Sequence, residues 1–269
     1  MNYFFNLSRV NKKPILKGTT ILIAGDSRVM TAINPDSIPN SRNIAQNSES
    51  YFLTYHKLKF ILPANPQIKR LVIGFSYPSF SAYMDRLYYK DIATTDIFSR
   101  LYPIMLPKDF APLKVDETKY YQVYFKQMLL LPHLKHEQYL GEFTKLPYGL
   151  NKANLESVVK RHYFDENNKN IGISRTTSAY LDSIINYCNK QNINLTLVNI
   201  PFQKDYLRSV PNNYIVFYNS KKEELIKRGV SILDYSQMEL DNKYFKDYNH
   251  LDLEGANYFT SLLKTEFEK

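Results

Sequence analysis

The sequence predicts an α/β fold: a three-layer sandwich with a five-stranded, mainly parallel sheet and a largely helical insertion. Short apolar runs alternate along the chain with segments whose apolar residues recur at helical spacing. The first run, at residues 19–27, holds a continuous apolar stretch and ends in a glycine turn, which is typical of a buried parallel strand. Strands joined by helices pair in parallel through right-handed crossovers, so helices are expected on both faces of the sheet.

The first half of the chain contains three of the expected strands. The strand TTILIAGDS (19–27) is followed by a short strand, SRNIAQ (41–46). Residues 49–65 have an apolar face at helical spacing and are closed by Pro63 and the Asn65-Pro66 pair, so they are expected to form a helix. The apolar run KRLVIGFS (69–76) predicts a third buried strand.

The second half repeats the alternation after Ser174, a candidate helix N-cap. Cys188 lies in the apolar pattern of the helix expected at 174–192, where a buried small side chain is expected. The elements expected here are a helix at 174–192, a strand at 192–202, a helix at 212–229 stopped by its final glycine, a strand at 230–236 and a last helix from after His250 to 267.

Residues 77–170 interrupt this rhythm. The interval is too long for a simple crossover, it is rich in Tyr, Pro and Lys, and a structureless loop of that length is improbable. We expect it to form a mostly helical insertion within a single domain spanning 1–269, and to cap the carboxyl edge of the sheet. Tyrosines of this insertion would then wall a groove, or would instead pack the cap onto the core; they include Tyr77, Tyr83, Tyr88 and Tyr89.

Composition narrows the classes of partner. The net charge is +9, which can attract nucleic acid, anionic membrane or acidic polysaccharide. The lysines are dispersed and no nucleic-acid-binding motif is present, so no nucleic-acid partner is expected. The 23 tyrosines and 16 phenylalanines, without any tryptophan, favour contacts with sugars, although packing also uses many aromatic rings.

No metal or cofactor is expected. A single cysteine excludes an internal disulfide and a cysteine-based metal site, and the five histidines have no ligand spacing. His133 and His136 could share a helical face as a metal pair, but solvent-facing or lid positions explain them more simply. The longest apolar stretches fall short of the roughly 18–20 residues needed to span a bilayer, so no transmembrane segment is expected.

Two polar motifs lie at opposite ends of the chain. Ser27 follows the first strand, and Asp247 and His250 stand three residues apart after the fifth. Because carboxyl ends of parallel strands share one edge of the sheet, these groups are expected to converge as nucleophile, base and orienter. The alternatives are that Ser27 only caps a helix and that the D-x-x-H motif is a helix entry. Asp252, however, is the better-placed N-cap candidate.

The motifs AGDSRVM and DYNHLDLEGA resemble the SGNH/GDSL superfamily of hydrolases and acyltransferases, over the core strands and helices. The resemblance implies a flavodoxin-like SGNH fold. It also implies that Ser27 is the nucleophile, His250 the general base and Asp247 its acidic partner, with Asp26 structural. The GDS block followed by Arg28 and an N-I-A segment is most similar to the envelope-polysaccharide branch, which includes glycan O-acetyltransferases and acetylesterases.

Two oxyanion-hole motifs depart from the superfamily pattern. Its third block carries an Asn that donates to the oxyanion, whereas IGFSYPSF places Ser76 there. Its second block offers a glycine N–H, whereas NIAQNSES has no glycine, so Asn47 or Ser48 would have to supply that amide. Losing one such donor costs about 10²–10³ in rate, so an inactive protein is an alternative.

The resemblance implies a serine-dependent esterase or O-acyltransferase, with acetyl as the expected group, acting on a bacterial surface carbohydrate or an acylated small molecule. Arg28 could bind a carboxylate or phosphate of the substrate, or form a surface ion pair, and Tyr77 is the second candidate for substrate binding. The alternative is a non-catalytic carbohydrate-binding or polysaccharide-assembly subunit with envelope partners. The N-terminal segment has no apolar signal-peptide core, so an envelope or periplasmic location requires an export or anchor segment trimmed from this chain; otherwise a cytoplasmic location is expected.

Overall fold

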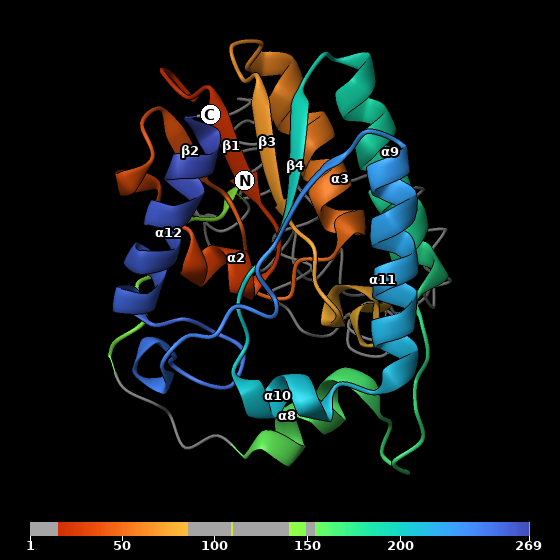
Figure 1. Cartoon of the computed structure of the whole chain (residues 1–269). Helices are drawn as coiled ribbons and strands as arrows, with labels where there is room; N and C mark the ends of the chain where they lie inside the picture. The colour runs from red at the N-terminus through yellow and green to blue at the C-terminus, as the bar shows by residue number, and fades with distance from the viewer. Residues whose placement is uncertain (1–15, 86–108, 110–139, 149–153, 269) are drawn as a thin grey trace, which may run out of the picture.

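The computed structural model describes residues 16–85, 109, 140–148 and 154–268, and it confirms the expected fold class. Within these residues five parallel strands form one sheet in the order β2-β1-β3-β4-β5 (Figure 1). This strand order is that of flavodoxin-like folds, in which ligands bind outside the carboxyl ends of the strands. The strands are β1 (Ile21–Ala24), β2 (Ser41–Asn43), β3 (Arg70–Gly74), β4 (Asn194–Asn199) and β5 (Ser231–Asp234).

Helices connect the strands wherever the alternation predicted them. The α-helices are α2 (Ser27–Ala32), α3 (Tyr51–Ile61), α8 (Leu155–Tyr163), α9 (Arg175–Lys190), α10 (Lys204–Ser209), α11 (Asn212–Lys227) and α12 (Leu253–Phe267). The short helix α10 was not expected from the sequence. The expected strand at 192–202 is longer than the observed β4, and Pro201, within its last residues, has no N–H to donate to a sheet ladder.

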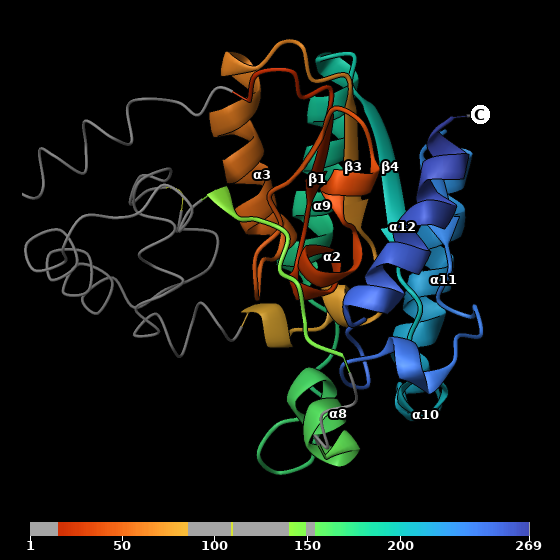
Figure 2. The same cartoon turned by 90° about the vertical axis from the view of Figure 1, so that its left-hand side faces the viewer.

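The two faces of the sheet bury two different apolar clusters. Leu22 of β1 packs with residues of α3, α9 and α11, whereas its neighbour Ile23 packs with residues of α2 and α12. Successive side chains of a strand point to opposite faces, which explains why β1 and residues 71–73 of β3 are continuously apolar. Figure 2 shows α3 and α9 on one side of the sheet and α12 on the other.

Local capping sets the helix boundaries as the sequence predicted. Ser174 accepts a hydrogen bond from the Thr177 N–H at the start of α9, and Asp252 accepts one from the Gly255 N–H at the start of α12. Because Asp252 caps α12, Asp247 is left to interact with other groups.

The expected insertion leaves and re-enters the core at neighbouring points. Ser81 and Ile173 form an isolated antiparallel bridge, and the Ser174 N–H donates to the Phe80 carbonyl at 2.8 Å. Within the insertion the structure describes α8, which agrees with the helical prediction for that part. Tyr88, Tyr89, His133 and His136 lie outside the described residues.

The return segment 140–148 runs along the core next to the loop after β2. Gly141 has a φ of +84°, and a Cβ there would lie 2.2 Å from the Ile44 carbonyl oxygen, so only glycine fits. The Leu140 carbonyl accepts from the Lys57 ammonium at 3.4 Å. Lys57 also pairs with Glu49, and both side chains are buried. This ion pair holds the loop between β2 and α3 against the return segment.

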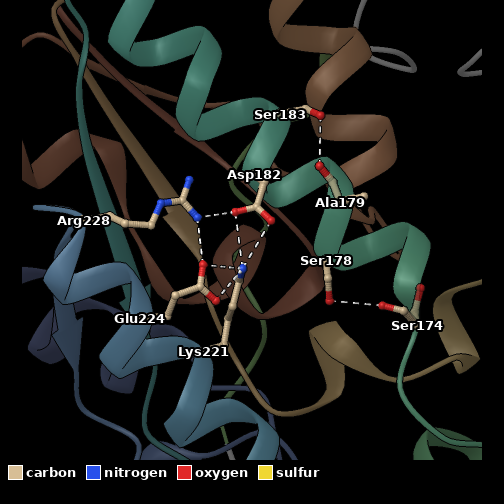
Figure 3. Close-up of polar contacts among 8 residues, drawn as sticks. All are labelled: Ser174, Ser178, Ala179, Asp182, Ser183, Lys221, Glu224 and Arg228. Atoms are coloured by element: carbon tan, nitrogen blue, oxygen red, sulfur yellow. Dashed lines mark hydrogen bonds and ion pairs between the residues drawn. The ribbon is translucent and has the colours of Figure 1, made fainter.

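Charged side chains link α9 to α11 on the outer surface (Figure 3). Asp182 of α9 accepts from Arg228 at 2.6 Å and from Lys221 at 3.2 Å. Glu224 also pairs with Arg228 at 2.9 Å and with Lys221 at 3.0 Å. The four side chains form one network that crosses the interface between the two helices.

Candidate active site

Ser27 begins α2 directly after the turn that ends β1. Asp26 is the N-cap of this helix, and its side chain accepts from the Arg28 N–H at 3.0 Å. Gly25 has a φ of +138°, and a Cβ on it would lie 3.3 Å from the Gly74 backbone nitrogen and 3.1 Å from Val29 Cγ2. The turn therefore requires glycine, and it presents the Ser27 side chain at the carboxyl end of the sheet.

A tight turn after β5 carries Asp247 and His250. The Asp247 side chain accepts from the N–H groups of Asn249 and His250, both at 2.9 Å. The same carboxylate lies 2.9 Å and 3.0 Å from His250 Nδ1 through its two oxygens. The turn is closed by an antiparallel bridge between Phe245 and Leu251. The hydrogen bonds of this turn explain why a spacing of three residues places the Asp247 carboxylate next to Nδ1 of the His250 ring.

The other ring nitrogen of His250, Nε2, lies 2.8 Å from Ser27 Oγ. Because the Asp247 carboxylate accepts from Nδ1–H, Nε2 is free to accept the proton of the serine. Burial alone would raise the pKa of the Asp247 carboxyl. The hydrogen bond and charge of His250, together with the N–H groups of Asn249 and His250, lower it below its ordinary value. The carboxylate is therefore charged at neutral pH, and the three expected groups lie in one hydrogen-bonded line.

Arg28 forms no surface ion pair, because only 3% of its surface is exposed. It lies in the wall of the groove described below, but its guanidinium nitrogens all donate to protein oxygens, which does not favour contact with a substrate. Its nitrogens donate to the carbonyls of Asn249 (3.2 Å), Pro201 (3.1 Å) and Ile200, and to Asn199 Oδ1 (3.2 Å). The guanidinium also lies 3.4 Å above the ring of Phe202, in cation–π contact.

The charge of Arg28 survives this burial. Desolvation lowers the pKa of the guanidinium to about 10, while nearby Asp26 raises it. The group is therefore a cation at neutral pH, and it joins the turn that carries His250 to the end of β4. We interpret Arg28 as a structural link between two parts of the site.

Ser27 and His250 open onto a groove of about 310 Å³. The loop after β2 contributes Asn47 and Ser48 to its wall, as the sequence analysis required of the second block. The start of the insertion contributes Pro78, Tyr83 and Met84. The lining is more polar than apolar, which favours a hydroxylated or charged ligand over a hydrocarbon chain.

Two sequence predictions for this groove are wrong in position. Ser76 is buried, and its hydroxyl is hydrogen-bonded to that of Ser79 at 2.8 Å, so it does not line the groove as an oxyanion donor would. Tyr77 is also buried: its ring packs against Phe202 and Tyr218, and its hydroxyl lies 3.3 Å from Ser236 Oγ. Tyr83, in contrast, does line the groove.

Sequence reasoning missed two groove residues on α8, Arg161 and His162. Arg161 is exposed, whereas His162 is buried and contacts Tyr206 and the ring of Tyr83. Neither residue has a local motif, because only the packing of α8 below the carboxyl edge brings them to the groove. Figure 1 shows α8 beside α10 at this end of the molecule.

In the described ranges no group of three or more His, Cys, Asp and Glu side chains could hold a metal ion. The same ranges contain no helix that is both long enough and apolar enough to cross a bilayer.

The sheet order and the hydrogen-bonded serine, histidine and aspartate together resemble the arrangement of SGNH/GDSL-like α/β proteins. The family model described as DltD protein matches residues 152–258, a range that includes Asp247 and His250 and excludes Ser27. No curated protein shows significant sequence similarity to the chain.

Several solved structures align with most of this chain at low sequence identity and with TM-scores below 0.5. A GDSL-like lipase from Bacteroides thetaiotaomicron VPI-5482 is 12% identical, with a TM-score of 0.46, over 99% of this chain and 97% of the other. A proposed acylhydrolase from Bacteroides fragilis NCTC 9343 is also 12% identical, with a TM-score of 0.45, over 97% and 93% of the two chains. A proposed platelet activating factor from Streptococcus pneumonia is 12% identical, with a TM-score of 0.48, over 98% of this chain and 90% of the other.

Proposed function

We propose that this protein is a serine-dependent O-acyl esterase or transferase, with acetyl as the expected group. It would act on a bacterial cell-surface carbohydrate through an acyl-serine intermediate. The observation that carries the proposal is the 2.8 Å contact between Ser27 Oγ and His250 Nε2, with Asp247 on the far side of the ring. This is the arrangement that activates a serine hydroxyl at neutral pH.

In the first half of the reaction, Ser27 Oγ attacks the carbonyl carbon of an ester, and its proton passes to His250 Nε2. The Asp247 carboxylate stabilises the imidazolium that forms. The bond to the leaving alcohol then breaks, and the alcohol oxygen takes the proton from His250. Acyl-Ser27 remains with a neutral histidine.

In the second half, water or a sugar hydroxyl attacks acyl-Ser27 and gives its proton to His250. The ester bond to Ser27 breaks, and Oγ takes that proton back. Hydrolysis and transfer therefore use the same groups, and they differ only in which hydroxyl occupies the groove.

The cell-envelope assignment and the carbohydrate assignment have one support each. DltD is a cell-envelope acyl-transfer protein, and its family model matches the C-terminal part of this chain. The groove lining is predominantly polar and includes Tyr83, whose ring and hydroxyl suit a sugar.

The oxyanion of the tetrahedral intermediate would be held by Asn47 and Ser48, which line the groove next to Ser27. Ser48 has a φ of +57°, so the chain turns sharply at this point. The buried pair of Glu49 and Lys57 directly after it fixes the loop. In this proposal the loop takes over the role of the missing third-block Asn.

One observation favours a second candidate, a non-catalytic carbohydrate-binding or polysaccharide-assembly subunit. The Ser76 hydroxyl is paired with Ser79 and does not line the groove, so one oxyanion donor of the superfamily pattern has no counterpart. A protein of this class would bind the carbohydrate and leave Ser27 unreactive.

Covalent labelling separates the two candidates. A fluorophosphonate probe is expected to modify wild-type protein at Ser27, and Ser27→Ala is expected to abolish the label. Ser27→Ala and His250→Ala should each reduce p-nitrophenyl acetate turnover nearly as far as the double variant, because the two residues act as a unit. Wild-type turnover equal to that of Ser27→Ala would remove the catalytic proposal and leave the binding subunit.

A further inference from the structure

α8 brings a second histidine to the groove that holds Ser27. Only 6% of the surface of His162 is exposed, and this residue lines the same cavity as Ser27 and His250. Its backbone carbonyl accepts from the Ser81 hydroxyl, which ties the end of α8 to the start of the insertion. His162 is thus an anchored, largely buried residue in the wall of the groove.

The hydrogen bonds of this ring define its tautomer. His162 Nδ1 lies 2.6 Å from the Tyr206 hydroxyl, and that hydroxyl donates to the Tyr163 hydroxyl at 3.1 Å. A hydroxyl has one proton, so Tyr206 accepts from Nδ1–H of His162. Nε2 is then unprotonated. Among the residues that the structure describes it has no hydrogen-bond partner, and it is not one of their fully buried unpartnered atoms, so it keeps some exposure. Nε2 is therefore a hydrogen-bond acceptor available at the groove.

The ring also stays neutral. Burial lowers the pKa of His162 to about 3, with smaller contributions from the charges of Arg161, His250 and Arg28. At ordinary pH such a ring accepts a hydrogen bond without removing the proton, unlike His250 in the proposed reaction.

We propose that His162 selects acceptors that carry two hydroxyl protons. One proton of the acceptor goes to His250 as its oxygen attacks acyl-Ser27, and a second O–H donates to His162 Nε2 and remains unchanged. Water and vicinal diols, such as those of sugars, satisfy both histidines, whereas a simple alcohol satisfies only one. This proposal rests on the proposed function, since it concerns the alcohol that resolves the acyl-serine.

The test compares two acceptors that differ in one hydroxyl, 1,2-propanediol and 1-propanol, with p-nitrophenyl acetate as the donor. The measured quantity is the ratio of acetyl transfer to the diol over transfer to the alcohol. In wild-type protein the ratio should favour the diol by about tenfold, the range of one hydrogen bond. His162→Phe should reduce the ratio to about one, and His162→Gln, which retains an acceptor oxygen, should keep part of the preference.

His56→Phe is the matched control, because His56 is another largely buried histidine, on α3, with aromatic neighbours Phe52 and Tyr180. It should leave the ratio unchanged. Ser27-dependent release of p-nitrophenol reports acylation of Ser27 separately. Normal Ser27-dependent release with the same diol preference in wild type and His162→Phe, or with no diol preference in wild type, would overturn the role of His162 alone. Wild-type release equal to that of Ser27→Ala would overturn the proposed function, and the acceptor assignment with it.

Discussion

At the scale of single residues, Arg28 shows how one side chain joins segments far apart in the sequence. Its guanidinium donates to oxygens of residues 199–201 and 249, and it stacks on Phe202. Its acceptors are neutral groups, mostly backbone carbonyls, which would be left buried without a donor if the arginine were removed. Arg28, which directly follows Ser27 in the sequence, thus holds in place the turn that carries His250.

Arg28→Met is expected to lower the free energy of unfolding by about 2–4 kcal/mol, because several buried carbonyls lose their donor. Arg28→Lys should also destabilise, since an ammonium cannot reproduce the planar fork. Urea denaturation measures both effects. Arg175→Met is the control: Arg175 is exposed at the start of α9, and its replacement should change stability by less than about 0.5 kcal/mol. Equal losses of unfolding free energy in Arg28→Met and Arg175→Met would contradict the structural role of Arg28.

At the scale of elements, α9 and α11 are joined by the network of Asp182, Lys221, Glu224 and Arg228 (Figure 3). Most of its side chains are one third or more exposed, but that of Lys221 is only 10% exposed. A network around a largely buried cation contributes more than an isolated surface pair, although still modestly.

Asp182→Asn should lower the free energy of unfolding by about 1 kcal/mol at low salt, because Lys221 and Arg228 both lose a charged partner. The loss should shrink in 1 M NaCl, where the screening length is about 3 Å. Glu239→Gln is the matched control, since its pair with Lys204 is exposed on both sides and should contribute nothing measurable. Urea denaturation at two salt concentrations checks the prediction, which fails if the Asp182→Asn loss is independent of salt.

At the scale of the whole molecule, two histidines couple stability to pH. Burial lowers the pKa of His162 to about 3 and that of His56 to about 4, from an ordinary value of 6.5. Between these values the unfolded chain binds more protons than the folded one. The free energy of unfolding should therefore fall as the pH falls from about 6.5 toward 4. Urea denaturation at pH 7, 6 and 5 should show a shallower pH dependence in His56→Phe than in wild type; parallel curves would contradict the assignment.

The parts of this molecule that the sequence predicted are those with a local signal. Apolar runs and helix caps located the strands and helices. The short Asp247–His250 turn is closed by N–H groups of the turn that donate to the Asp247 carboxylate. Parallel strands bring their carboxyl ends to one edge, so Ser27 could be paired with that turn.

The other site residues depend on tertiary contacts that leave no local pattern. Arg28 is buried by carbonyls about 170–220 positions away, and His162 reaches the groove only through the packing of α8. Ser76 and Tyr77 follow a strand end, as expected, but the turn at Pro78–Phe80 directs their side chains inward. Position along a strand was therefore predictable, whereas side-chain direction beyond its end was not.

The contact of Leu140 and Gly141 with the core limits which segments can be exchanged between related proteins. Lys57 donates to Leu140, and the Gly141 backbone lies against Ile44, in the chain that leads to Asn47 and Ser48. A chimera that replaced the insertion as a block, from Tyr77 to Asn170, would remove both contacts and α8 with them. A functional transplant would have to keep residues 140–148 and 154–170 native and join foreign sequence between 85 and 140, so the part of the insertion that can be swapped is smaller than the part that interrupts the fold.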